Sequence, residues 1–418
     1  MLIAKDVASV MDMGWDFLPE AEQLKEAFKS GGVEECRIML ERKRDEWKEV
    51  PLNVAVIGNS GVGKSSFINA IRGLTADDDE AAPVGVKETT VDIRSYEHPD
   101  NPKLKFWDLP GVGTDRFPKA NYLSEIDVDR YDFFLLITAD RFTENDTWLG
   151  NEFCKRSKKY FFVRTKIGVD VSSNKKAHPQ THNEEAVMRD ILQSTQEHLR
   201  ANRCENVPVF LIDNYKLKKF DFEQLEHRLV EDFPKMKKTA LVLSLQSTSE
   251  EVIRLKVAEL RSRMWKLGAL SAAVAVAPVP GVSLVFDLGL VAKEAEVYHT
   301  QLGLDETSLR RYAKLTSCDY QQLQSVVDSH LGARLIGVEG MKQLVQMLCK
   351  ASTPLLASAA EEGSRFIPII GSFIAAPLSF AGTYCTLKLI LNKMENVALD
   401  VITTAASSAA DAEQSDSE

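Results

Sequence analysis

The residues best suited to chemistry in this sequence lie in one short run with the spacing Gly-x-x-x-x-Gly-Lys-Ser. The run comprises Gly58, Asn59, Ser60, Gly61, Val62, Gly63, Lys64 and Ser65, and Ser66 follows it. In such a loop the backbone N–H groups turn inward around an anion, the lysine reaches the β- and γ-phosphates, and the hydroxyl ligates Mg²⁺. The pattern therefore predicts a site for a nucleoside polyphosphate and Mg²⁺, in which Lys64 also serves catalysis.

The segments on either side of this run are those that a phosphate-binding loop requires. Residues 53–58 are apolar and partly β-branched, which indicates a buried strand. Phe67, Ile68 and Ile71 then begin a helical period. Strand, loop and helix in this order place the positive end of a helix dipole at the bound anion, so the motif has more support than its glycines alone would give.

A second chemical group follows the next inner strand. Asp108 ends the expected strand 103–108 and begins the sequence Asp-Leu-Pro-Gly, which finishes at Gly111. In phosphoryl-transfer enzymes with this loop, an aspartate at a strand end holds Mg²⁺. We expect Asp108 to hold the metal through water and the Gly111 N–H to contact the γ-phosphate.

The loop 75–90 is acidic and polar and is expected to be mobile. Thr89 or Thr90 at its end could complete the Mg²⁺ shell. Val112 occupies the position at which many small GTPases carry a water-positioning glutamine, so another group must orient the attacking water. Glu88 is the nearest candidate for orienting or deprotonating it; the alternative is a solvated loop glutamate.

Base recognition is expected after the strand 159–165, where Thr165 precedes Lys166. The lysine stem would pack on a purine ring, and an aspartate two residues later would accept hydrogen bonds from guanine N1 and N2. Here that position is Gly168, and the next carboxylate is Asp170. Either Asp170 substitutes through a shifted loop or the preference for guanine is weakened.

A second loop is expected to complete the base pocket. It follows the strand 207–212 and contains Asp213 and Asn214. Its backbone N–H groups and the Asn214 amide could contact the base, so both residues are predicted to bind nucleotide.

The middle of the chain alternates between strand and helix patterns. The expected strands are 53–58, 90–97, 103–108, 131–138, 159–165 and 207–212, and the expected helices are 64–73, 143–157, 183–203 and 220–233. Such alternation predicts an α/β fold with a mostly parallel sheet covered on both faces. A short turn joins 90–97 to 103–108, which should therefore form an antiparallel edge.

The outer parts of the chain have helical spacing throughout. We expect N-terminal helices within 1–49, a nucleotide-binding domain at 50–237, a helical domain at 238–404 and a disordered acidic tail at 405–418. The helical domain should pack with the N-terminal helices. It thus draws on both ends of the chain.

Two apolar runs, 267–286 and 366–387, reach the length of about 20 residues that can span a bilayer. Prolines such as Pro278 and Pro377 interrupt them. This favours two buried helical hairpins, and insertion into a membrane is the alternative.

Composition limits the possible partners and compartments. The net charge of −10 argues against a dedicated nucleic-acid binder. Six scattered cysteines suit a reducing compartment and no structural zinc, and the N-terminus has no secretory pattern, so a cytoplasmic location is expected. Three basic clusters, at 155–159, 216–219 and 235–238, are either solvated faces or contacts for anionic lipid.

These motifs together resemble the immunity-related GTPases, an interferon-inducible, dynamin-like family, over about residues 15–402. The resemblance rests on Gly58–Gly73, Ala82–Thr90, Phe106–Gly113, Arg130–Phe134, Tyr160–Lys166 and Leu302–Leu309. Phe-Trp-Asp-Leu-Pro-Gly and Phe-Val-Arg-Thr-Lys are its most specific stretches. The chain departs from the family pattern at Gly168 and at Leu2, where family members carry the base-reading aspartate and a myristoylated glycine.

The resemblance implies a Ras-like domain set on a helical domain made from both chain ends. It puts Thr90 rather than Thr89 on the metal and Glu88 in a catalytic role. It also implies GTP and GDP as ligands and GTP-dependent self-assembly, as a dimer or oligomer, through the nucleotide face. Related GTPases would be further partners. The implied place of action is intracellular membranes, at vacuoles that enclose pathogens, reached by peripheral association from the cytoplasm.

Three functions remain open from the sequence. The first is a self-assembling GTPase of cell-autonomous innate immunity. The second is a nucleotide-binding regulatory scaffold with little hydrolysis and weakened guanine specificity, because Gly168 and Val112 remove two usual contributors. The third, an ATP-using phosphotransferase, lacks a catalytic-base motif.

Overall fold

The computed structural model describes residues 45–85, 92–114, 116–139, 143–202, 204, 206–275, 282–331 and 368–415, together with scattered positions between 23 and 42. The chain divides into two compact units, one of residues 47–252 and the other of residues 1–46 with 253–418. The second boundary lies beyond the expected 237/238 because the helix α9 (Lys235–Ser244) packs against a strand and a helix of the first unit.

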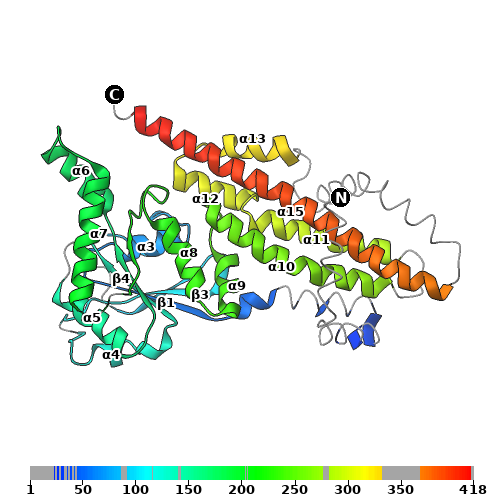
Figure 1. Ribbon diagram of the computed structural model, residues 1–418, viewed down its shortest axis with the longest axis horizontal. Helices are drawn as coiled ribbons and strands as arrows, with labels where there is room; N and C mark the ends of the chain where they lie inside the picture. Colours follow the sequence, from blue (N-terminus) through cyan, green and yellow to red (C-terminus); the bar gives the residue numbers. More distant parts are fainter. Residues whose placement is uncertain are drawn as a thin grey trace. The chain divides into compact units, whose positions relative to one another are not determined.

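The first unit is built on a six-stranded sheet with the order β2-β3-β1-β4-β5-β6. Figure 1 labels β1, β3 and β4 of this sheet. Its strands are β1 (Leu52–Ile57), β2 (Arg94–His98), β3 (Asn101–Asp108), β4 (Phe133–Thr138), β5 (Tyr160–Arg164) and β6 (Val209–Leu211). Every neighbouring pair is parallel except β2 and β3, which are antiparallel. The predicted α/β fold, with one antiparallel edge strand, is confirmed.

Helices cover both faces of this sheet. They are α3 (Lys64–Ile71), α4 (Tyr122–Glu125), α5 (Glu144–Lys155), α6 (Ile167–Ala177), α7 (Glu184–Ala201), α8 (Phe222–Asp232) and α9. On one face, Phe134 of β4 packs against Phe153 of α5 with ring centroids 4.4 Å apart. On the other face, α3 and α8 meet through Phe67 and Phe222 at 5.9 Å. Aromatic pairs of this kind add to the stabilisation that burial provides.

The helix α6 was not expected from the sequence. Its apolar positions are few, and the two that are buried, Ile167 and Val171, lie one turn apart and pack with Leu211 and Phe220. Isoleucine and valine also have modest helix propensity. Contacts with α7, with β6 and with the loop after β6 therefore determine this helix, and its local sequence does not reveal them.

The second unit is helical in the part that the structure describes. Its helices include α10 (Glu250–Ala275), α11 (Val282–Gln301), α12 (Glu306–Thr316), α13 (Tyr320–Leu331) and α15 (Pro368–Ser415). The long α15 contacts α11, α12 and α13. Arg261 of α10 donates to Glu395 of α15 at 2.8 Å, so α10 and the last helix of the chain are in contact.

The expected hairpin at 366–387 is wrong. Residues 368–387 lie in α15, which continues through Gly371 and Pro377. A proline inside a helix removes one backbone hydrogen bond at a cost of about 3 kcal/mol, and the packing of so long a helix can offset that cost. The other run covers the end of α10 and the start of α11, and residues 276–281 between them lie outside the described residues. Within the described part of the chain, no helix combines the length and apolar character needed to cross a membrane.

The expected disorder of the tail is also wrong for residues 405–415, which continue α15. Alanine is the best helix former, and an existing helix extends at little cost. Ala405 is fully buried, and Ser408 Oγ donates to Gln322 Oε1 of α13 at 3.1 Å. Residues 405–408 are thus held by packing that the composition of this stretch does not indicate.

This packing predicts that Ala405→Asp lowers the free energy of unfolding by about 2 kcal/mol, because it buries an unpaired charge. Ala406→Asp, one residue later on the exposed face, is the matched control and should change it by less than about 0.5 kcal/mol. Urea unfolding of the full chain measures both. Equal effects of the two substitutions would show that the tail does not pack.

Candidate nucleotide-binding site

The phosphate loop runs from the end of β1 to the first turn of α3 and passes close to β4. A Cβ atom on Gly58 would lie 2.1 Å from the Ile137 carbonyl oxygen, so only glycine fits there. Lys64 is buried, and its Nζ donates to the carbonyls of Gly58 at 3.1 Å and Asn59 at 3.2 Å. The lysine charge is therefore held inside the curve of the loop.

Ser65 and Asp108 meet beside this loop although 43 positions separate them in the sequence. The Ser65 Oγ donates to Asp108 Oδ2 at 2.9 Å. Parallel pairing of β1 with β3 places Val56 opposite Asp108 and so brings the two together. Gly111 is also at the loop, since a Cβ on it would be 3.5 Å from the Gly58 carbonyl oxygen.

The pair of Ser65 and Asp108 fits a magnesium site. Mg²⁺ prefers oxygen ligands and is usually held by one or two carboxylates together with substrate phosphates and waters. No cluster of three or more metal-ligating side chains of the His, Cys, Asp or Glu type occurs among the described residues. A hydroxyl and one carboxylate oxygen are the donor set that a phosphate-bound Mg²⁺ needs. Glu88 and Thr90 lie outside the described residues.

The loops expected to bind the base also hold the phosphate loop. Lys166 Nζ donates to the Gly61 carbonyl at 2.8 Å, and Thr165 Oγ1 donates to the Val62 carbonyl at 2.6 Å. Asn214 Nδ2 donates to the Gly63 carbonyl at 3.1 Å. Because C=O and N–H point in opposite directions in a trans peptide group, engaging these three consecutive carbonyls turns the following three N–H groups to the other side of the loop.

The remaining predicted residues of the loop and of the helix start have these surroundings. Asn59 Nδ2 donates to Thr143 Oγ1 at 3.4 Å, and Ser66 Oγ is 3.3 Å from the Tyr215 hydroxyl. Ser60 is exposed and Val62 is buried. The structure thus brings together every predicted nucleotide-binding residue that it describes except Asp170.

Comparison with known proteins agrees with this geometry. The family model described as Interferon-inducible GTPase (IIGP) matches residues 19–358.

The chain belongs to the interferon-inducible GTPase family.

Its relatives include Interferon-inducible GTPase 5 of Rattus norvegicus, 34% identical over 375 residues that cover 90% of this chain and 80% of the relative. Interferon-gamma-inducible GTPase 10 of Mus musculus is 32% identical over 383 residues, which cover 91% and 86%. Among solved structures, NFeoB from S. thermophilus bound to GDP.AlF4- and K+ is 17% identical with a TM-score of 0.29, covering 65% of this chain and 93% of that one. A bacterial dynamin pair is 10% identical with a TM-score of 0.34, covering 93% and 74%. By family, the enzyme is a GTPase.

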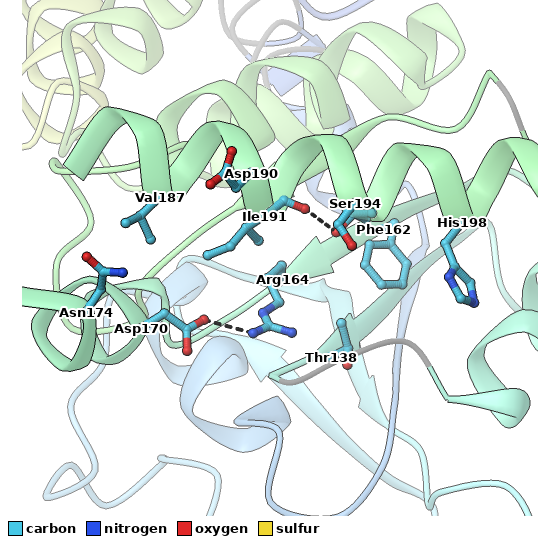
Figure 2. Close-up of a pocket in the computed structure, with 11 residues that line it drawn as sticks. Thr138, Phe162, Arg164, Asp170, Asn174, Val187, Asp190, Ile191, Ser194 and His198 are labelled. Carbon is cyan, nitrogen blue, oxygen red and sulfur yellow. Dashed lines mark hydrogen bonds and ion pairs between the residues drawn. The ribbon is translucent and has the colours of Figure 1, made fainter. Parts of the chain in front are cut away.

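In this GTPase, Asp170 does not join the other predicted residues. Its Oδ2 pairs with Arg164 Nη2 at 2.8 Å, and both side chains line a cavity of about 540 Å³ beside α7 (Figure 2). The cavity is lined by Thr138, Phe162, Arg164, Asp170, Asn174, Val187, Asp190, Ile191, Ser194, Thr195 and His198. A step of two residues on an α-helix rotates the side chain by about 200°. Since α6 begins at Ile167, Asp170 and position 168 face different ways, and Asp170 is not retained as a base contact.

Val112, at the position where a water-positioning glutamine is absent, is an apolar core residue. Its side chain is buried in the apolar core below the site. Its carbonyl accepts from Asn145 Nδ2 at 2.9 Å. Neither contact of Val112 leaves a polar side-chain group at this position.

Two positioning residues were not identified from the sequence. The side-chain amide of buried Asn69 in α3 makes two hydrogen bonds to the backbone of Ala82. It donates to the Ala82 carbonyl at 2.9 Å and accepts from the Ala82 N–H at 2.7 Å. Tyr122 donates to the Pro110 carbonyl at 2.6 Å and fixes the loop after Asp108. Burial raises the pKa of Tyr122 well above its usual value, so the hydroxyl remains a donor. The only sign of the role of Asn69 in the sequence is that an amide side chain stands on the apolar face of α3.

Removal of the loop lysine tests the site. Lys64→Ala should weaken GDP binding at least about a hundredfold, because an ammonium bound to two phosphates contributes charge-assisted hydrogen bonds of about 1.5–3 kcal/mol each. Lys175→Ala, at an exposed lysine of α6, is the control and should leave the affinity unchanged. Fluorescent-nucleotide titration measures both. Wild-type affinity in Lys64→Ala would contradict the assignment of this loop.

Proposed function

We propose that this chain binds GTP with Mg²⁺, hydrolyses it to GDP, and assembles with further copies through its nucleotide face. The observation that carries the proposal is the contact of Ser65 with Asp108 at 2.9 Å beside the buried Lys64. A hydroxyl, a carboxylate and an ammonium at one loop are the groups that phosphoryl transfer requires.

Each of these groups has a separate task. Lys64 carries the positive charge for the β- and γ-phosphates, and the N–H groups of the loop bind their oxygens. Ser65 and Asp108 would hold Mg²⁺, which neutralises charge on the phosphates when bound. Gly111 would offer its N–H to the γ-phosphate. The helix α3, which begins at Lys64, adds its positive dipole end.

The hydrolytic step needs a group that orients water, and we assign it to Glu88. Two points support the assignment. Val112 is buried in the core, and the segment before Glu88 is anchored where Asn69 holds Ala82. Thr90 would complete the magnesium shell from the same loop.

Glu88→Ala should therefore keep GTP binding within about threefold and lower single-turnover hydrolysis at least about a hundredfold, since general-base catalysis contributes 10²–10⁴-fold. Glu80→Ala, in the same acidic loop at an exposed position, is the control and should hydrolyse GTP normally. Unchanged turnover in Glu88→Ala would return that residue to the role of a solvated glutamate. GTP binding without turnover in the wild type would favour the regulatory scaffold.

Exposed apolar side chains support assembly through the nucleotide face. Tyr215, Val169 and Val84 are 77%, 59% and 43% exposed. Tyr215 lies in the loop after β6, and Val169 lies in the first turn of α6, which follows β5. Val84 lies in the segment that leads to Glu88 and Thr90. Apolar groups gathered on one face mark interaction surfaces.

Tyr215→Ser should reduce the dependence of the GTP hydrolysis rate on protein concentration several-fold while leaving GDP affinity within about twofold. Tyrosine is among the residues that contribute most to binding at interfaces. Leu389→Ser, at a residue of α15 that is 49% exposed, is the control. A rate per molecule that is independent of wild-type concentration would contradict assembly.

We further propose that the protein associates peripherally with intracellular membranes, at vacuoles that enclose pathogens, as part of innate immunity. Related family members would be additional partners. Family membership supports this role.

A further inference from the structure

A carboxylate occupies the space beside Gly168 although that position has no side chain. A Cβ atom built on Gly168 would lie 2.2 Å from Asp213 Oδ2 and 3.4 Å from Asp213 Cγ. Gly168 lies in the first turn of α6, after β5, whereas Asp213 follows β6. The Asp213 carboxylate from the neighbouring loop thus fills the space that a side chain at position 168 would take.

The backbone holds the two loops together at this point. Parallel pairing of β5 with β6 places Arg164 opposite Leu211. Ile167 N–H then donates to the Ile212 carbonyl at 3.2 Å, which joins the start of α6 to the residue before Asp213. These backbone contacts hold the chain at Asp213 next to the chain at Gly168.

The two oxygens of the Asp213 carboxylate differ in their surroundings. Oδ1 accepts from the Tyr215 N–H at 3.0 Å, which closes a turn of the Asx type. Oδ2 has no hydrogen-bond or ion-pair partner within the described part of the chain. The residue is 8% exposed as a whole, so an acceptor on a largely buried residue remains available at this place.

This acceptor lies at the base end of the nucleotide site. Asn214, the next residue, donates to the Gly63 carbonyl of the phosphate loop, and Lys166, two residues before Gly168, donates to the Gly61 carbonyl. A guanine ring presents N–H donors at N1 and N2, whereas adenine has an acceptor at N1 and no amine at C2. An ionised carboxylate only accepts hydrogen bonds, so it favours guanine over adenine.

We infer that Asp213 supplies the carboxylate that recognises guanine, and that residue 168 is glycine because the Asp213 side chain takes its space. The inference rests on the proposed nucleotide site. It differs from both alternatives left open by the sequence, since guanine recognition is neither lost nor transferred to Asp170, which pairs with Arg164.

A change of base preference provides the first test. Asp213→Asn keeps an acceptor for the Tyr215 N–H and replaces Oδ2 with an NH₂ donor. The donor opposes the guanine amine but matches xanthine, which has a carbonyl at C2. Affinity for GDP should fall at least about a hundredfold, from two charge-assisted hydrogen bonds of about 1.5–3 kcal/mol each, and affinity for XDP should rise at least tenfold. Asp170→Asn is the matched control and should leave the GDP-to-XDP ratio unchanged.

A double-mutant cycle provides the second test. Gly168→Asp should weaken GDP binding at least tenfold, because its carboxylate would clash with and repel that of Asp213. Combining it with Asp213→Ser should restore the preference for GDP over ADP, since one carboxylate again has the space. Such strong non-additivity is expected only of residues in direct contact. The cycle also covers the case in which Asp213→Asn fails to fold.

The outcomes separate the inference from the function on which it rests. Wild-type protein that binds neither GDP nor GTP would overturn the proposed function. Wild-type binding with undiminished GDP affinity in Asp213→Asn would overturn the inference alone. If Asp213→Asn loses GDP binding without gaining XDP binding, at an unchanged melting temperature, Asp213 acts only through the turn. That result would also overturn the inference. An independent, additive effect of Gly168→Asp in the cycle would do the same.

Discussion

Parallel pairing of β1 with β3 on one side and β4 on the other is the constraint on which the site depends. It places Val56 opposite Asp108 and opposite Leu135. The strand β1 therefore lies between β3 and β4, which follow it in the chain on opposite sides. The loops that follow the carboxyl ends of these three parallel strands meet at the same edge of the sheet. Ser65 reaches Asp108 only because of this arrangement. A shift of one residue in the register would turn the Asp108 side chain to the other face of the sheet.

The parts of the site that could be predicted from the sequence are those with local causes. The phosphate loop is recognisable because its strand, glycines and helix are consecutive, and Asp108 because it ends a strand and begins Asp-x-x-Gly. The sequence left the role of Asp170 open because it did not predict a helix after Lys166. In the structure a helix begins at Ile167, and its rotation turns Asp170 toward Arg164. Nothing local reveals that helix, whose stability comes from contacts with α7, with β6 and with the loop after β6.

The relation of Gly168 to Asp213 could not be predicted for a different reason. The two residues are distant in sequence and become neighbours only through the pairing of β5 with β6. From the sequence alone, Gly168 is a missing carboxylate and Asp213 is one acidic residue of a loop. In the structure, the absence of a side chain at Gly168 leaves room for the Asp213 carboxylate, which comes from the loop after β6. The continuation of α15 through Pro377 to Ser415 is similar, because packing that the local sequence does not show determines the outcome.

The hydrogen bonds from the base loops to the phosphate loop couple the two ends of the site. Lys166, Thr165 and Asn214 occupy three consecutive carbonyls of that loop. These donors belong to the same two segments that carry Gly168 and Asp213. A base that displaces either segment must therefore also disturb the carbonyls whose engagement orients the phosphate-binding N–H groups. Hydrogen-bond networks can contribute more than the sum of their members, so in the proposed site the binding of the base and the binding of the phosphates would change together. In the proposed mechanism, an interaction at the base would then alter hydrolysis without contacting the γ-phosphate.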